Sequence, residues 1–190
     1  MLTLAVQDTG PTTPAGEDAF ARLVERDLDR VWRFLRALLR DADLARDVAH
    51  EAFLRLRAAL DKGRARVDGE GLPVAAYVFA TARNTAMSHL RRARTRRRHV
   101  VPLDAGGCEV RDDAPPDREL DRAELRAALD AALANLDEIH RSVFLLSEIE
   151  GLRYEEIAGI LDIPPGTVAS RKHHAAQRLR RELERSGHAL

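Results

Sequence analysis

The stretch that decides the fold lies near the end of the chain, where residues 154–171 read YEEIAGILDIPPGTVASR. Its first part places apolar side chains at helical spacing, which predicts a short helix over 154–161. A turn follows, and Pro165 stands at the first position of a second helix, where proline is favoured because no N–H donor is needed there. Val168 is placed to pack back against the first helix. The stretch therefore predicts a helix-turn-helix whose second helix runs to about Arg185.

The second helix of this motif is rich in cations. Residues 171–185 hold six lysines and arginines against two glutamates. In a helix-turn-helix, the second helix enters the major groove of DNA by its N-terminal end. Short polar residues early in that helix reach base edges, while long cations contact phosphates. The residues expected to contact duplex DNA are Thr167, Ser170, Arg171, Lys172, His173, His174 and Arg178.

The N-terminal half is also helical by pattern. Residues 1–16 are rich in Thr, Pro and Gly without periodicity and predict a disordered tail. Residues 17–99 carry apolar stripes at helical spacing and predict one domain. Asp41–Asp43 predicts a turn with a helix N-cap, and the Gly-bearing stretch Lys62–Pro73 predicts a loop.

An acidic stretch separates this half from the second one. Residues 104–124 hold eight acids against three arginines, with prolines and glycines nearby, so we expect a flexible linker over 100–122. A second domain is expected over 123–187, in which Asp137 caps a helix whose apolar stripe reaches Ile149 and which Gly151 ends. The predicted fold class is all-α: two small helical domains joined by a flexible acidic linker, the C-terminal one containing the helix-turn-helix.

Composition excludes several classes of protein. The 190 residues hold 31 Lys and Arg and 31 Asp and Glu, so the net charge is zero and a uniformly basic nucleic-acid coat is excluded. Aromatic residues make up only 4%, which favours helices over a sandwich or barrel. The single cysteine, Cys108, excludes an internal disulfide. No signal peptide or membrane-spanning run is recognisable, so a cytoplasmic protein that does not insert into membranes is expected.

An arginine run ends the first half. Seven arginines and no acid lie between Arg83 and His99, and such a cluster is self-repelling unless a polyanion is near. The same predicted helix offers Tyr77, Phe79 and Asn84. Cations with a few aromatic rings and an amide suit single-stranded DNA, whose bases stack and present their edges. A solvated surface run is the alternative.

The predicted helix over Asp43–Leu60 has a polar outer face with Asp47, His50 and Glu51. Two interpretations stay open for it, a solvated face and a protein-docking face. For enzymes the sequence is poor, because it holds no HExxH, CxxC, GxSxG or Gly-rich phosphate loop. We therefore expect no catalytic site, no metal and no cofactor.

Beyond these patterns, the sequence resembles a known family. Residues 136–138 and 151–171, with the pattern GLxYEEIAxxLxIPxGTVxSR, resemble the domain of bacterial sigma factors that reads the promoter −35 element. Residues 41–56 resemble the helix of that family that binds core RNA polymerase, and residues 77–92 its −10-reading helix. The resemblance covers about residues 18–183. A chain with only these two domains is similar to the small extracytoplasmic-function sigma factors.

Five positions depart from the family pattern. Glutamine is usual at His50, tryptophan at Tyr77 and aspartate at Ser88. In the second helix of the motif, Ala169 replaces a usual cation and His174 a usual arginine. These departures bear on the promoter sequence that is read rather than on the class.

The resemblance implies a non-enzymatic factor that binds core RNA polymerase and directs promoter-specific initiation. It implies that the C-terminal domain reads duplex −35 DNA and that the first domain captures a base flipped out of single-stranded −10 DNA, between the Lys62–Pro73 loop and the helix carrying Asn84. An anti-sigma factor is a further implied partner. The implied polymerase-binding residues are Asp43, Asp47, His50, Glu51 and Phe53. The implied −10-binding residues are Tyr77, Arg83, Asn84, Ser88, Arg91 and Arg92.

Two other functions stay open at this point. A stand-alone helix-turn-helix regulator would use the last domain and would need a dimer or a ligand domain. A non-DNA adaptor built of helical hairpins would leave the arginine run unexplained.

Overall fold

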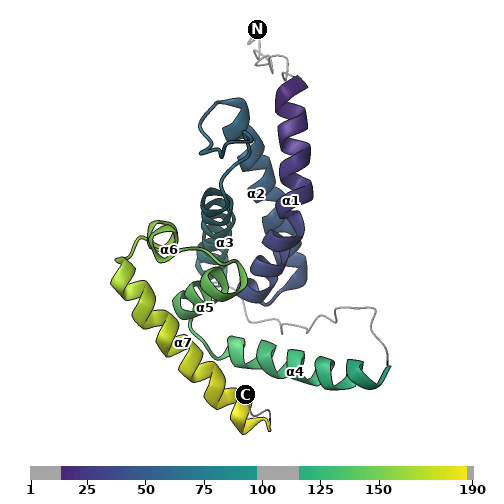
Figure 1. The fold of residues 1–190 in the computed structure, drawn as a ribbon, viewed down its shortest axis with the longest axis vertical. Coiled ribbons are helices and arrows are strands. Elements are labelled where there is room, and N and C mark those ends of the chain that lie inside the picture. The colour runs from purple at the N-terminus through teal and green to yellow at the C-terminus, as the bar shows by residue number, and fades with distance from the viewer. Residues whose placement is uncertain (1–13, 98–115, 188–190) are drawn as a thin grey trace.

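The computed structural model describes residues 14–97 and 116–187, and both ranges are dominated by helices. Figure 1 shows three long helices packed together, α1 (Pro14–Leu39), α2 (Ala42–Asp61) and α3 (Ala75–Arg97). The C-terminal half adds α4 (Pro116–Ala134), α5 (Glu138–Phe144), the π-helical turn η1 (Leu145–Ile149), α6 (Tyr154–Leu161) and α7 (Pro165–Arg185). The predicted all-α class is confirmed.

Two predicted non-helical segments meet the described residues only at their edges. α1 begins at Pro14 and α4 at Pro116, inside the stretches 1–16 and 100–122 that the sequence predicts as tail and linker. The rest of the tail, and the linker up to residue 115 with Cys108, lie outside the described residues. Within the described ranges, no helix is both long and apolar enough to cross a membrane.

Local sequence signals set the helix ends as predicted. Asp41 Oδ1 accepts a hydrogen bond from the backbone N–H of Leu44 at 2.9 Å and caps α2. Asp137 Oδ1 accepts from the N–H of His140 at 3.0 Å and caps α5 in the same way. Gly151, with φ of 66°, makes the left-handed turn after η1. Pro165 opens α7.

One turn departs from the predicted periodicity. The N–H of Glu150 donates to the carbonyl of Leu145, five residues back, at 3.1 Å. This π-helical turn adds a residue to the helix and rotates the later positions about the helix axis. Ile149, which the sequence places on the apolar stripe, is 58% exposed as a result.

Apolar side chains of both halves form one continuous core. In the N-terminal bundle, Phe34 of α1 meets Phe79 of α3 edge-to-face, with ring centroids 5.4 Å apart. In the C-terminal half, fully buried Ile157 of α6 and Val168 of α7 hold the helix-turn-helix together. The predicted packing of Val168 against the first helix of the motif is thereby confirmed.

The two halves touch through polar contacts as well. Arg141 of α5 is buried, and its Nη1 donates to the carbonyl of Leu38 in α1 at 2.8 Å. Arg30 of α1 pairs with Glu150 at 3.0 Å. In the described structure the halves therefore pack against each other, with α6 beside α3 (Figure 1).

Candidate docking and nucleic-acid surfaces

A groove runs between α1 and α2 along the face predicted to dock a protein. It has a volume of about 550 Å³ and mixes apolar walls with charged rims. Of the predicted docking residues, His50 lines it, while Asp43 and Asp47 are exposed on the same helix. Sequence reasoning missed its apolar part. Its lining residues are Val24, Glu25, Leu28, Asp29, Trp32, Arg46, Ala49 and His50.

The missed residues carry a signal that could have found them. Leu28 and Trp32 lie one turn apart on α1, off the buried stripe, and Leu28 is 43% exposed. Leu54, one turn after His50 on α2, is 53% exposed. Large apolar residues among charges on the polar side of a helix are typical of interaction surfaces.

The other two predicted docking residues lie elsewhere. Phe53 is only 5% exposed and packs its ring edge-on against Phe20, so its side chain belongs to the core and not to the exposed face of α2. Its position follows from the apolar stripe of α2, to which it belongs. Glu51 turns toward α3, where its Oε2 lies 2.6 Å from His89 Nε2, and it also pairs with Arg55. The hydrogen bond from His89 is the main cause that lowers the pKa of Glu51, and Arg55 adds to it.

The residues predicted to bind −10 DNA lie along α3 but are not equally available. Asn84, Arg91 and Arg92 are exposed, while Tyr77 and Ser88 are half-buried. Ser88 Oγ donates to the carbonyl of Asn84 at 2.9 Å. These residues form the open part of the surface.

Arg83 differs from the rest of the set. Its Nη2 pairs with Glu138 Oε1 of α5 at 2.6 Å, and its side chain is only 13% exposed. Its buried Nε has no hydrogen-bond partner among the described residues. One of the cations predicted to bind DNA, Arg83, is therefore already paired with a carboxylate of the C-terminal half.

Between α2 and α3, the predicted loop is folded into a small hairpin over residues 66–74. Val67 and Pro73 form an isolated antiparallel bridge, and the N–H of Val74 donates to the carbonyl of Arg66 at 2.9 Å. Asp68 Oδ1 accepts from the N–H groups of Glu70 and Leu72, each at 3.0 Å. The N–H of Leu72 is the main cause that lowers the pKa of Asp68.

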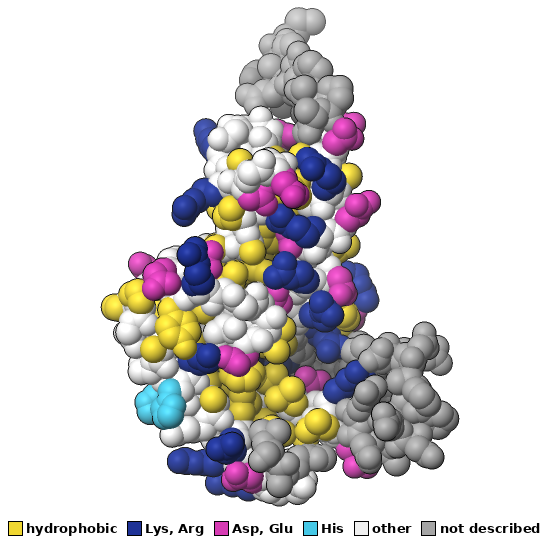
Figure 2. Space-filling model, viewed as in Figure 1, with side chains coloured by type: hydrophobic (Ala, Val, Ile, Leu, Met, Phe, Trp, Pro, Cys, Tyr) yellow, Lys and Arg dark blue, Asp and Glu magenta, His cyan; other side chains and the backbone are white. Residues whose placement is uncertain are grey.

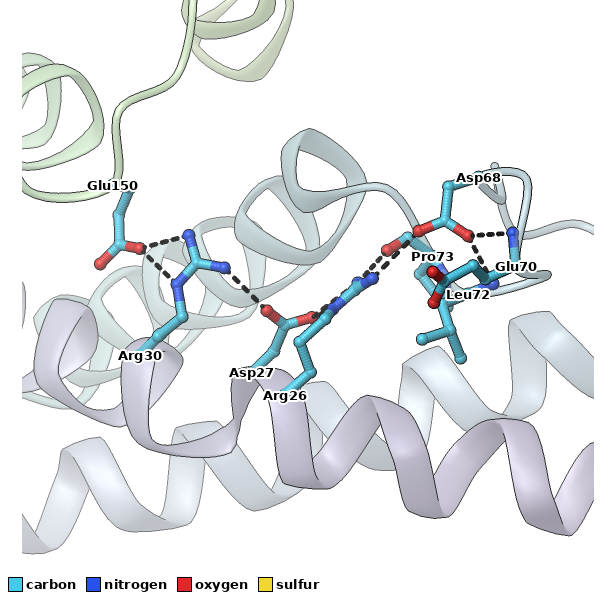
Figure 3. A network of polar contacts seen from close by, with 8 residues as sticks. All are labelled: Arg26, Asp27, Arg30, Asp68, Glu70, Leu72, Pro73 and Glu150. Atoms are coloured by element: carbon cyan, nitrogen blue, oxygen red, sulfur yellow. Dashed lines mark hydrogen bonds and ion pairs between the residues drawn. The ribbon is translucent and has the colours of Figure 1, made fainter.

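Figure 3 shows a chain of polar contacts that leads from this hairpin across α1 to the C-terminal half. Arg26 contacts Asp68 and the carbonyl of Pro73 at the hairpin, and Asp27 on its other side. Asp27, fully buried, also accepts from Arg30 at 3.1 Å. Arg30 then reaches Glu150.

The predicted −35 residues on α7 divide between faces of the helix. Ser170, His174 and Arg178 follow each other at one-turn spacing and are all exposed. The same face carries half-buried Thr167 and Arg171 near its start. Sequence reasoning missed its continuation to two exposed cations, Arg181 and Arg185. We call these residues the α7 stripe.

Lys172 and His173 point away from the α7 stripe. Lys172 Nζ lies 2.5 Å from Glu148 and 5.6 Å from the centre of the Tyr154 ring, and the bond to Glu148 is the main cause that raises its pKa. His173 faces a groove of about 530 Å³ between α4 and α7. Figure 2 shows apolar side chains gathered between these two helices. The apolar residues that line the groove include Leu125, Leu129, Phe144, Leu179 and Leu183.

Charge is distributed in keeping with zero net charge. Figure 2 shows basic side chains alternating with acidic ones over α1 rather than forming one basic field. Within the part of the chain that the structure describes, no cluster of His, Cys, Asp or Glu could hold a metal ion.

Comparison with known proteins assigns each half to a family. The family model for sigma-70 region 2 matches residues 23–96, and that for sigma-70 region 4 matches residues 126–179. The chain is 34% identical over 173 residues to the RNA polymerase sigma-H factor of Pseudomonas aeruginosa, covering 87% of this chain and 86% of that protein. It is 34% identical over 174 residues to the ECF RNA polymerase sigma factor SigL of Mycobacterium tuberculosis, covering 91% and 94%.

A solved structure shares the fold. The sigma factor RpoE, in its complex with the anti-sigma factor NepR from Bartonella quintana, superposes with a TM-score of 0.68 at 23% identity. The match covers 87% of this chain and 96% of RpoE. At this level of identity the similarity shows the fold alone.

Proposed function

The chain belongs to the sigma-70 family, as a sigma factor of the extracytoplasmic-function type, and from this we propose how its surfaces divide the work of promoter-specific transcription initiation. Residues 17–99 act as the region-2-like domain and residues 123–187 as the region-4-like domain, joined by the acidic linker. The family assignment replaces the alternatives of a stand-alone regulator and an adaptor.

We propose that the α7 stripe reads the −35 element. The observation that carries this is the exposed row Ser170, His174 and Arg178 on the second helix of a helix-turn-helix. Ser170 and His174 reach base edges, while Arg178 and the later arginines contact phosphates. Lys172 and His173 do not face the same groove, so they are left out of this stripe.

We propose that α3 and the hairpin 66–74 bind the single-stranded −10 element. Asn84, Arg91 and Arg92 are exposed there, which suits base edges and phosphates. Tyr77 and Ser88 lie on the same helix, half-buried. Arg83 joins them when Glu138 releases it.

We propose that core RNA polymerase docks on the groove between α1 and α2. Leu28, Trp32 and His50 line this groove and supply apolar area, and Asp47, exposed on the same helix as His50, adds charge. An anti-sigma factor is a further proposed partner, as RpoE of the same fold was solved with one. Since polymerase and chromosome are its targets, the cytoplasm is the proposed location.

The decisive experiment is run-off transcription with core polymerase over a promoter library. We expect selective use of promoters with defined −35 and −10 elements, and no transcription from them by core polymerase alone. Failure of the chain to bind core polymerase would contradict the proposed function.

A charge reversal tests the docking surface. Asp47→Lys should weaken binding to core polymerase by about tenfold, on the scale of a close interfacial charge. Asp61→Lys, at the far end of α2, is the matched control and should bind as wild type does. Equal affinities for both variants would remove Asp47 from the docking surface.

A further inference from the structure

The hairpin 66–74 is short and mostly exposed, so something outside it must fix its position. Its own bonds close the turn: Asp68 N–H donates to the carbonyl of Leu72 at 2.7 Å, and the Asp68 carboxylate holds two N–H groups. These bonds shape the hairpin but do not tie it to the bundle. Leu72 and Pro73 are buried at its base, while residues 69–71 are exposed.

Besides this buried base, Arg26 of α1 makes a polar connection between the hairpin and the bundle. Its Nη1 donates to Asp68 Oδ2 at 3.0 Å and its Nη2 to the carbonyl of Pro73 at 2.5 Å, so one planar guanidinium holds both strands of the hairpin (Figure 3). A weaker contact accompanies it, from Arg22 to the carbonyl of Glu70 at 3.3 Å.

Asp27 fixes Arg26 in turn. Its carboxylate is fully buried, lies 2.9 Å from Arg26 Nε and accepts from Arg30 on the other side. Burial lowers the pKa of Arg26, but the hydrogen bonds and charges of Asp27 and Asp68 outweigh this and raise it, so the guanidinium stays charged. A charged, planar donor held at its Nε has little freedom to swing away from the hairpin.

We propose that Arg26 is a positioning residue for −10 recognition: it fixes the hairpin 66–74 beside α3, so that the flipped base meets a preformed wall. This rests on the proposed −10 function of α3 and the hairpin. Extruding a base costs a few kcal/mol, which is recovered only if the pocket is already shaped to receive it. A loose hairpin admits any base and holds none of them well.

The test uses holoenzyme assembled with core polymerase and a fork DNA whose −10 strand is single-stranded. Its sequence is the one preferred by wild type in the promoter library. Affinity is compared between this probe and probes changed at one −10 base at a time. Arg26→Gln should reduce the preference at the captured base on the order of tenfold, the scale of one lost base contact. Core binding and −35 duplex binding should stay within about twofold of wild type.

Two variants separate positioning from mere stability. Arg26→Lys keeps the charge but not the fork, so it should restore part of the preference. Asp68→Asn keeps an acceptor for the two N–H groups and weakens the link to Arg26, so it should lower the preference, and its effect should not add to that of Arg26→Gln. Arg33→Gln is the control, as Arg33 pairs with exposed Asp29 on the same helix and contacts no part of the hairpin.

The outcomes divide cleanly. Wild-type base preference in both Arg26→Gln and Asp68→Asn would overturn the proposal. A parallel loss of −10, −35 and core binding with unchanged base preference would also overturn it, because that pattern marks a structural role. If wild-type holoenzyme shows no base preference on the fork, the proposed −10 function itself fails, whatever Arg26 does.

Discussion

Arg83 of α3 pairs with a carboxylate from the other half of the molecule, whereas Lys172 and Arg178 of α7 have carboxylates from their own half beside them. On α3, Arg83 pairs with Glu138, which belongs to the C-terminal half. On α7, Lys172 pairs with Glu148, and Arg178 lies 3.9 Å from Asp137, both within its own half. The difference teaches that the two proposed DNA-binding surfaces depend differently on how the halves are arranged. Separating the halves would release Arg83 and leave the neighbours of α7 as they are.

The junction itself mixes one strong contact with weaker ones. Arg141 donates four hydrogen bonds from a buried guanidinium to backbone carbonyls: two in the last turn of α4, one of Leu136 just after it, and one of Leu38 in α1. Its side chain thus caps the C-terminal end of α4 and at the same time binds α1 of the other half. The pairs Arg83–Glu138 and Arg30–Glu150 are peripheral by comparison, with arginine side chains that are 13% and 34% exposed.

The largest effect is expected at Arg141. Arg141→Met keeps the apolar stem and removes every donor, leaving buried carbonyls without partners, so the free energy of unfolding should fall by about 3 kcal/mol or more. Urea unfolding measures this. The exposed Arg33→Met should stay within about 0.5 kcal/mol of wild type. A similarly small change for Arg141→Met would show that water replaces its bonds and that the junction does not depend on it.

The next effect concerns the α7 stripe. His174→Ala should cost about 1–3 kcal/mol at the preferred −35 sequence and relax the preference at one base pair. Arg178→Ala should weaken binding to all sequences alike and reduce the salt slope by about 0.9. Transcription from a −35 library at two salt concentrations measures both. If Arg178→Ala changed the preferred sequence while His174→Ala did not, the two roles would be reversed.

A smaller effect is expected from releasing Arg83. Glu138→Gln removes a partly exposed ion pair worth about 0.2–1 kcal/mol, so the isolated chain should bind a single-stranded −10 oligonucleotide up to about fivefold more tightly. Fluorescence anisotropy at low salt measures it. Glu148→Gln is the matched control, because its partner Lys172 lies in the same half. An equal gain in both variants would mean that net charge, and not release of Arg83, is responsible.

Much of this architecture could be predicted from local sequence. The caps Asp41 and Asp137, the glycine at 151 and the proline at 165 each act within a few residues, so their chemistry is legible in the sequence. The junction is not, because Arg30 and Glu150 are 120 residues apart and nothing in the spacing of either pairs them.

Where side chains lie differently from the predicted sites, the reasons are physical as well. The sequence prediction included Lys172 and His173 because they lie near the N-terminal end of α7. Which residues of a helix face the same groove depends instead on their direction around the helix axis. This direction could have been calculated at about 100° per residue from buried Val168, and the calculation would also have placed Arg181 on the exposed face. Ile149 could not have been corrected in this way, since a π-helical turn has no clear sequence signature. Phe53 fits both the apolar stripe of α2 and the family's polymerase-binding pattern, and in the structure its side chain is buried with the stripe.

The smallest effects concern two glutamates on either side of Gly151, whose pKa values move in opposite directions. Burial, only partly offset by Arg30, raises the pKa of Glu150, whose side chain is 3% exposed. The backbone N–H of Arg153 is the main cause that lowers the pKa of Glu156, which lies in the first turn of α6. Because the folded state favours the protonated form of Glu150, its contribution to stability is full below the ordinary value of 4.5 and is lost as the pH rises through the higher folded-state value. The contribution of Glu156 is present above its ordinary value and is lost as the pH falls through the lower one.

Neutral substitutions should therefore shift stability in opposite directions at pH 7. Glu150→Gln should be more stable than wild type, since glutamine avoids burying a charge and Arg30 keeps Asp27 as its partner. Glu156→Gln should be less stable, since it weakens the acceptor at the start of α6. Both differences should stay within about 1 kcal/mol and shrink as the pH is lowered toward 4, where the wild-type carboxyl groups gain protons. Thermal unfolding across pH 4–7 measures them. If Glu150→Gln instead lost stability at every pH, the charge of the Arg30–Glu150 pair would be holding the halves together. Arg141 would then no longer be the one strong contact of the junction.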